Sequence, residues 1–212
     1  MREDSGAGRP RRIIVAMTGA TGAILGIRLL EALRVLGVET HLVMSEWAER
    51  TVRIETSYSV AAVRDLASVH HRFDNQAASI SSGSFRVDGM VVVPCSMNTL
   101  AALAHGIGDN LIVRAADVVL KERRTLVVVP RETPFNTTHL RNLLALGEMG
   151  VSILPPMLTY YNHPASVDDM TRHIVARVLD QFDIDNDLTV RWPAVVRRRR
   201  STEPDGSDAV VS

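Results

Sequence analysis

The fold is decided by the stretch Ile13-Ile14-Val15-Ala16-Met17-Thr18-Gly19-Ala20-Thr21-Gly22-Ala23. Its continuous apolar first half is typical of a strand that is buried on both faces, as in a parallel sheet. Gly19 and Gly22 allow a sharp turn and leave no side chain between the backbone and a ligand. The helical pattern that follows directs its first N–H groups and its positive dipole end at the turn. The stretch therefore predicts a strand, a turn and a helix. A phosphate suits this turn, but a strand-to-helix turn without a ligand fits the stretch equally well.

Length and composition predict a single α/β domain. The chain has 212 residues, 46% of them hydrophobic, which is ordinary for a globular protein with a sizeable core. Its 24 basic and 24 acidic side chains cancel, so no overall field favours nucleic acid or an anionic membrane. The single cysteine, Cys95, excludes an internal disulfide and fits a reducing compartment. Because the sequence shows no apolar signal core and no apolar run of about 20 residues, we expect a cytoplasmic protein without a membrane segment.

Apolar strands alternate with amphipathic helices along the chain. We expect further strands at 39–44, 69–73, 90–94, 125–130 and 151–154, with Pro94 ending the fourth of the six. Helices are expected at 47–53, 60–66, 97–104, 109–121, 138–149 and 166–182, several of them after a serine N-cap, and 75–84 reads as a loop. This order predicts a three-layer α/β/α parallel sheet with helices on both faces.

Two terminal segments are expected to lie outside this domain. Residues 1–11 are rich in Gly, Arg and Pro and predict a disordered arm. Residues 193–212 are polar and basic, with four arginines at 197–200, and predict a disordered, solvated tail. Four charges without aromatic residues are a weak signal for nucleic-acid binding. The domain is therefore assigned to residues 12–192.

Small polar groups follow the ends of four predicted strands. In an open parallel sheet, ligands bind beyond the carboxyl ends of the strands, so these groups should share one rim. Their hydroxyls, amide and helix N–H groups can bind a phosphate and the polar edge of a ring, and an arginine can hold a phosphate through two hydrogen bonds. Taken singly, each Ser or Thr is equally well explained as an N-cap. The rim comprises Gly19, Ala20, Thr21, Ser45, Cys95, Ser96, Met97, Asn98, Thr99, Arg131 and Glu132.

A second group of charges lies in the segment 114–123. Arg114, Asp117 and Lys121 recur at helical spacing, so one helix face would be charged. This face is either a solvated ionic network or part of a second phosphate site, to which Tyr161 and Arg177 could add. The histidines show no metal-ligand spacing, and we expect no metal. The sequence has no P-loop, nucleophile elbow or zinc-protease motif.

Five segments resemble the flavin prenyltransferases of the UbiX/Pad type, formerly described as aromatic acid decarboxylases. They are Met-Thr-Gly-Ala-Thr-Gly-Ala (17–23), Pro-Cys-Ser-Met-Asn-Thr-Leu (94–100), Arg-Ala-Ala-Asp-Val-Val-Leu-Lys-Glu-Arg-Arg (114–124), Val-Pro-Arg-Glu-Thr-Pro (129–134) and Tyr-Tyr-Asn-His-Pro (160–164). The resemblance implies a flavodoxin- or Rossmann-like fold that binds FMN and assembles as a homododecamer. It implies transfer of a dimethylallyl group from dimethylallyl phosphate to N5 and then C6 of reduced FMN. The product, prenylated FMN, would serve UbiD-type decarboxylases.

The resemblance also implies roles for individual residues. Glu55 and Glu132 match carboxylates that handle protons, Glu55 at the flavin end and Glu132 at the phosphate end. Lys121 matches a cation that stabilises the departing phosphate, the usual role of preorganised charge. Removal of the C6 proton would fall to a carboxylate or to that phosphate. The implied FMN site is Gly19, Ala20, Thr21, Ser45, Ser96, Met97, Asn98, Thr99 and Arg131, and the implied donor site is Arg114, Lys121, Tyr161 and Arg177.

Two departures and two alternatives accompany this interpretation. Thr21 stands where many members have serine, and the loop 74–78 lacks the tryptophan that flanks the prenyl group in some members. One alternative is an FMN-dependent cysteine decarboxylase of the phosphopantothenoylcysteine decarboxylase type, because 94–98 resembles its Pro-x-Met-Asn motif. That chemistry needs a histidine near the flavin. The other alternative is a non-catalytic FMN-binding subunit of a hydroxyaryl decarboxylase, which would bind FMN without alkylating it.

Overall fold

A computed structural model of the chain describes residues 9–192. The tail expected at 193–212 and the first eight residues of the expected arm lie outside the described residues. Arg9 and Arg11, which the sequence assigns to the arm, contact the domain: Arg9 binds the Asp88 carboxylate at 2.7 Å, and Arg11 donates to the Phe182 carbonyl at 2.7 Å. Within residues 9–192, no helix combines the length and the apolar character needed to cross a bilayer.

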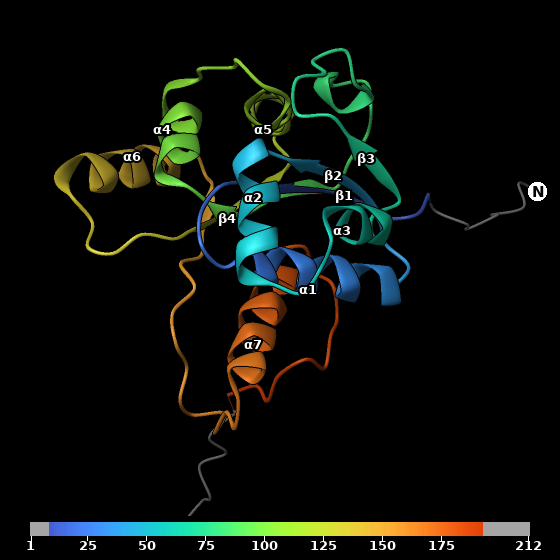
Figure 1. The fold of residues 1–212 in the computed structure, drawn as a ribbon. Helices are drawn as coiled ribbons and strands as arrows, with labels where there is room; N and C mark the ends of the chain where they lie inside the picture. The colour runs from blue at the N-terminus through green and yellow to red at the C-terminus, as the bar shows by residue number, and fades with distance from the viewer. Residues whose placement is uncertain (1–8, 193–212) are drawn as a thin grey trace, which may run out of the picture.

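Six parallel strands form one sheet in the order β3-β2-β1-β4-β5-β6. The strand β1 pairs with β2 on one side and with β4 on the other (Figure 1). From β1 the chain adds β2 and β3 on one side, and from β4 it adds β5 and β6 on the other side. The order of the strands therefore reverses between β1 and β4, where the ligand crevice of such a doubly wound sheet is expected. The strands are β1 (Arg12–Met17), β2 (Glu39–Met44), β3 (Val69–His71), β4 (Gly89–Cys95), β5 (Thr125–Pro130) and β6 (Ser152–Ile153).

Helices cover both faces of the sheet, which confirms the three-layer α/β/α prediction (Figure 1). One face packs against α1 (Ala23–Val35), α2 (Glu46–Glu55), α3 (Val60–Leu66) and α7 (Val167–Asp180). The other packs against α4 (Met97–His105), α5 (Leu111–Lys121) and α6 (Thr137–Glu148), together with the short turn η1 (Ser79–Ser81). Successive β1 residues alternate between the two faces, because side chains of a strand point to opposite sides. Each face therefore has its own apolar core.

Several boundaries differ from the expectations. Pro94 does not end its strand, because the ladder between β4 and β5 shifts register between Val92 and Cys95 and the proline sits in that irregularity. The helix expected from 109 begins at Leu111, since the Asn110 side chain accepts the Val113 N–H at 3.1 Å and acts as the N-cap. The strand expected over 69–73 ends at 71, and the loop 75–84 contains η1.

Candidate functional site

Thr18 joins β1 to β4 at the point where the strand order reverses. Its buried hydroxyl donates to the Pro94 carbonyl at 2.8 Å and accepts the Ser96 N–H at 2.8 Å, and its own N–H reaches Pro94 O at 3.2 Å. The first loop and the start of α4 are thereby held side by side. Sequence reasoning assigned no role to Thr18, because a threonine at the end of an apolar strand gives no local signal of a partner far along the chain.

A cleft of about 800 Å³ opens beside this junction, at the carboxyl ends of β1, β2 and β4. Such a volume suits a nucleotide-sized ligand. The polar residues predicted for this rim that do line the cleft are Gly19, Ser45, Ser96, Asn98 and Thr99. The structure thus brings five of the predicted FMN-site residues together.

Two serines in the cleft are helix N-caps as well. Ser45 Oγ accepts the Ala48 N–H at 3.1 Å, and Ser96 Oγ accepts the Thr99 N–H at 3.3 Å. The sequence left open whether these serines are N-caps or line a ligand site. The two interpretations are compatible, because a capping serine places both its hydroxyl and the unpaired N–H groups of its helix at the cleft.

Trp47 forms a wall of the cleft directly over Gly19. A Cβ atom added at Gly19 would lie 2.3 Å from Trp47 Cβ, so no other residue fits here without displacement. The Trp47 side chain is 63% exposed, and the Arg50 guanidinium lies 4.7 Å from the centroid of its rings. Sequence analysis missed Trp47, although a large aromatic two residues after a capping serine could have indicated it.

His105 and Asn110 line the far end of the cleft, together with Phe73, Ile107 and Val113. The His105 Nε2 atom lies 3.2 Å from Oδ1 of the buried Asn142 on α6, which fixes the orientation of the imidazole ring. Sequence analysis gave His105 no role beyond noting that it lacks metal-ligand spacing. Its approach to the cleft depends on how α4 ends, which composition does not reveal.

Four residues predicted for the FMN site do not line the cleft: Ala20, Thr21, Met97 and Arg131. The Met97 side chain packs against the apolar core beneath the cleft. Arg131 lies at the end of β5, where its N–H donates to the Cys95 carbonyl at 3.1 Å, so it belongs to the same rim. The neighbouring Glu132 accepts the Thr133 N–H at 3.0 Å.

Glu55, the last residue of α2, occupies the N-terminus of α1. One oxygen of its carboxylate accepts the N–H groups of Gly22 and Ala23 at 2.8 and 3.0 Å. Gly22 has a φ of 98°, a left-handed conformation that favours glycine. A carboxylate of the chain itself thus accepts two of the N–H groups at this turn, as the ligand-free interpretation of the first stretch allows. The N-termini of α2 and α4 face the cleft.

Cys95 is a packed thiol, as its position between a strand and a helix led us to expect. It is completely buried, and burial raises the pKa of its thiol to about 12. The thiolate is thus disfavoured at neutral pH, which removes Cys95 as a nucleophile.

The four residues predicted for the donor site divide between the two faces of the sheet. Arg114 and Lys121 lie on α5, where Arg114 binds Asp117 at 2.8 Å and Lys121 pairs with Glu122. Arg177 lies on α7, and Tyr161 meets His173 of the same helix edge to face at 5.9 Å. The helices α5 and α7 cover opposite faces (Figure 1), so one chain does not bring the four residues together.

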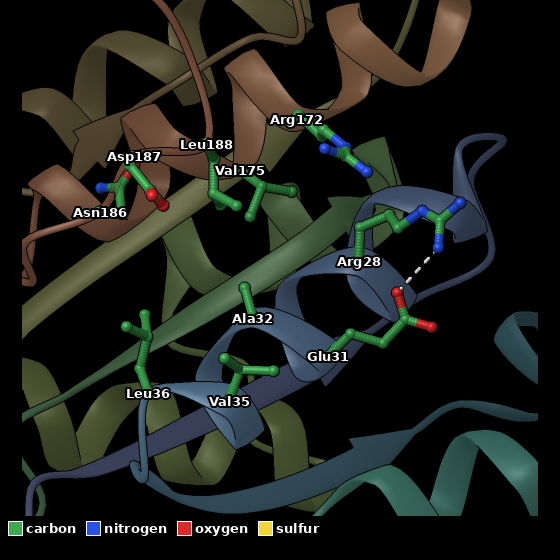
Figure 2. Close-up of a pocket in the computed structure, with 10 residues that line it drawn as sticks. All are labelled: Arg28, Glu31, Ala32, Val35, Leu36, Arg172, Val175, Asn186, Asp187 and Leu188. Carbon is green, nitrogen blue, oxygen red and sulfur yellow. Dashed lines mark hydrogen bonds and ion pairs between the residues drawn. The ribbon is translucent and has the colours of Figure 1, made fainter.

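A smaller hollow of about 250 Å³ lies between α1, α7 and the segment after α7. Figure 2 shows its apolar floor and its charged rim, where Arg28 pairs with Glu31 at 2.9 Å. It lies away from the carboxyl edge and contains none of the predicted site residues. Across residues 9–192, no three side chains of His, Cys, Asp or Glu are arranged to hold a metal ion.

Comparison with known proteins identifies close relatives over most of the chain. The flavoprotein family model matches residues 1–179. A probable UbiX-like flavin prenyltransferase of Streptomyces sp. (strain D7) is 56% identical over 93% of this chain and 100% of its own length. The crystal structure of a dodecameric FMN-dependent UbiX-like decarboxylase from Escherichia coli O157:H7 is 58% identical, with a TM-score of 0.85 over 86% of this chain and 99% of that chain. The crystal structure of AnUbiX (PadA1) in complex with FMN and dimethylallyl pyrophosphate is 56% identical, with a TM-score of 0.86 over 87% of this chain and 98% of that chain.

Proposed function

This chain belongs to the flavoprotein family and, within it, to the UbiX-like flavin prenyltransferases, and on that premise we propose that it alkylates reduced FMN with a dimethylallyl group. The observation that carries the proposal is the cleft at the junction of β1 and β4, which joins a nucleotide-sized volume to a rim of hydroxyl, amide and backbone N–H groups. The donor is dimethylallyl phosphate and the product is prenylated FMN.

We propose that the cleft holds FMN with its phosphate on the α2 and α4 side. The Ser45, Ser96 and Thr99 hydroxyls and the N-terminal N–H groups of both helices supply hydrogen bonds and a favourable dipole. Asn98 would bind the polar edge of the ring, and Trp47 would pack against the ligand's apolar surface. We keep four further rim residues as proposed members of the FMN site: Ala20, Thr21, Met97 and Arg131. Of these, Arg131 is the one that offers a positive charge to the ligand.

The chemistry requires a group that stabilises the departing phosphate. Reduced FMN supplies nucleophilic positions at N5 and C6, and the allylic C–O bond of the donor breaks as the new bond forms. Lys121, Arg114 and Arg177 would stabilise the negative charge that the phosphate gains, without proton transfer. No divalent ion is required if these side chains supply the positive charge.

Two copies of the chain complete the donor site in this proposal. Arg114 and Lys121 on α5 and Tyr161 and Arg177 on α7 lie on opposite faces, so they act on one phosphate only if a second copy supplies one pair. A homo-oligomer meets this requirement, and the solved Escherichia coli relative is dodecameric. A closed oligomer also repeats the same site at every equivalent interface.

Glu55 and Glu132 are the carboxylates proposed for proton handling. Glu55 is held at the N-terminus of α1, next to the first loop, which suits a role at the flavin end. Glu132 follows Arg131 at the rim, which suits the phosphate end. Proton removal from C6 needs one of these groups, or the released phosphate, within hydrogen-bond reach.

We propose that the prenylated FMN passes to a UbiD-type decarboxylase, and that the reaction takes place in the cytoplasm. The single, buried cysteine is consistent with a reducing compartment. The alternative cysteine decarboxylase would leave Lys121, Tyr161 and Arg177 without a role. A non-catalytic FMN-binding subunit would bind FMN without alkylating it, so a transfer assay separates this alternative from the proposed prenyltransferase.

The test is anaerobic incubation of the protein with reduced FMN and dimethylallyl phosphate, followed by mass spectrometry of the extracted flavin. We expect the flavin mass to rise by one C5 unit. We expect Lys121→Ala and Glu132→Gln to bind FMN normally and to lose most of the transfer. A wild-type protein that binds FMN and returns it unchanged would favour the accessory-subunit alternative and contradict the proposed function.

A further inference from the structure

Asp180, at the end of α7, joins two arginines, one on the same helix and one in the segment that follows it. Its carboxylate accepts a hydrogen bond of 2.6 Å from Arg177 Nη1 and hydrogen bonds of 3.1 and 2.8 Å from Nη1 and Nη2 of Arg191. The Asp180 side chain is 16% exposed, whereas those of Arg177 and Arg191 are 50% and 52% exposed. The carboxylate is thus a half-buried anchor that presents two guanidinium groups at the surface.

The group carries a net positive charge. Hydrogen bonding by Arg191, above all, holds the pKa of Asp180 below its ordinary value, so the carboxylate stays ionised at neutral pH. Within these three groups it cancels one of the two cationic charges and leaves the other. The Asp185 carboxylate is also close enough to help raise the pKa of Arg191. The Asn186 side chain donates to the same carboxylate at 3.3 Å and brings no charge.

Both guanidinium groups keep hydrogen-bond donors for a ligand. A guanidinium has five N–H donors. Among residues 9–192, Arg177 uses Nη1 alone and Arg191 uses Nη1 and Nη2. Two guanidinium groups side by side offer more of the remaining N–H donors to the several oxygens of a phosphate than one does.

Tyr161 lies at the same place. Its ring meets the Trp192 ring edge to face at 5.0 Å and the His173 ring at 5.9 Å. His173 precedes Arg177 by one turn of α7, and Trp192 directly follows Arg191, so both neighbours of Tyr161 lead to the arginine pair. Tyr161, Arg177 and Arg191 therefore gather on one face of α7.

We propose that Arg191 is a further substrate-binding residue, which holds the phosphate of the prenyl donor together with Arg177, and that Asp180 is the positioning residue for both. This inference rests on the proposed function, which places Arg177 and Tyr161 at that phosphate. The competing explanation is that Arg191 only latches the segment after α7 onto the helix. The two explanations differ in what they predict for the binding of an anion.

The test measures binding of dimethylallyl phosphate by calorimetry to the full chain loaded with oxidised FMN, so that no transfer competes with binding. We expect Arg191→Gln to weaken binding about tenfold or more, the loss expected for one charge-assisted hydrogen-bonded contact. Arg191→Lys keeps the charge but not the guanidinium geometry, so its affinity for dimethylallyl phosphate should lie between those of the wild type and Arg191→Gln. The affinity should also depend less steeply on salt concentration in Arg191→Gln, because one screened cation is gone.

Arg172→Gln is the matched control, since Arg172 lies on the same helix and pairs with Asp168 at 2.9 Å. It should bind the donor as the wild type does. Donor affinity of Arg191→Gln within about twofold of the wild type would overturn the inference. So would a weaker affinity with an unchanged salt dependence and a lowered melting temperature, which indicates a latch. If the wild type transfers the prenyl group and Arg191→Gln binds the donor as tightly as the wild type, this inference alone is overturned. If the wild type binds the donor but transfers nothing, the proposed function alone is overturned.

Discussion

Gly19 lets the Trp47 side chain pack directly against the backbone of the first loop, because a glycine has no Cβ atom. We expect Gly19→Ala to lose about 1–3 kcal/mol of stability, as overpacked sites do, because the new methyl would lie 2.3 Å from Trp47 Cβ. FMN affinity should fall as Trp47 shifts, and a fluorescence titration with FMN measures this. Gly147→Ala is the control, since its nearest neighbouring atom is at 3.8 Å. FMN affinity that Gly19→Ala leaves unchanged would mean that Trp47 and Gly19 do not shape the ligand site.

Trp47 allows a direct reading of where the flavin binds. The chain has two tryptophans, so Trp192→Phe leaves Trp47 as the sole indole fluorophore, and Trp47→Phe leaves Trp192. We expect added FMN to quench Trp47 strongly, because Trp47 lines the cleft. Steady-state emission of the Trp192→Phe variant at saturating FMN measures this quenching. Trp47 emission that saturating FMN leaves unchanged would place the flavin elsewhere.

Thr18 acts at the scale of the elements, because one hydroxyl links β1 to β4. Thr18→Val keeps the shape and leaves Pro94 O and Ser96 N–H each without this partner, at a cost of about 1–3 kcal/mol for a buried group. Denaturant unfolding measures the loss, and FMN affinity should fall with it as the crevice loosens. Thr18→Ser, which restores the hydroxyl, should recover most of both. A Thr18→Val variant as stable as the wild type would show that the hydroxyl bridge does not hold the two strands together.

The edge strand β3 carries a pH dependence. His71 Nε2 lies 2.8 Å from His41 Nδ1 of β2, and His41 in turn contacts Glu39, which pairs with Arg12. Burial, first of all, lowers the pKa of His71, and it lowers that of the neighbouring His70 as well. The folded state therefore binds fewer protons than the unfolded state once the pH falls below about 6.5, the ordinary histidine value.

Stability should accordingly be full above that pH, should fall as the pH drops through the window between the unfolded and folded pKa values, and should then level off. Denaturant midpoints measured between about pH 7 and pH 5 test this, and His71→Gln should flatten the fall. His139→Gln keeps the capping box of α6 and should leave the pH dependence in place. A pH profile that His71→Gln does not alter would refute the assignment.

Strands and N-caps were predictable because their signals are local. The runs at 39–44 and 125–130 each contain a stretch of at least three apolar residues and match β2 and β5 residue for residue. The expectation that Pro94 ends its strand was wrong, because an irregularity in the ladder accommodates a proline that a regular ladder would exclude. The Glu55 cap and the Trp47 wall join residues far apart in the chain, and no period or composition encodes such a meeting.

At the scale of the whole molecule, the fold separates the two halves of the proposed donor site. The residue types of α5 and α7 could be read from the sequence. The crossover between β3 and β4 moves α4, α5 and α6 to the other side of the sheet, and the segment after β6 brings α7 back to the face that α1 covers. A site that needs both faces can work only in an assembly. The central claim is therefore that cations from two copies act on one phosphate beside the FMN cleft.

Complementation between two inactive variants tests this claim most directly. Lys121→Ala and Arg177→Ala, co-expressed with different tags and co-purified as mixed oligomers, should transfer the prenyl group at about a quarter of their sites, where each intact half meets the other. Each variant alone should bind FMN and transfer almost nothing. Mixed oligomers that bind FMN and remain as inactive as the single variants would contradict the account.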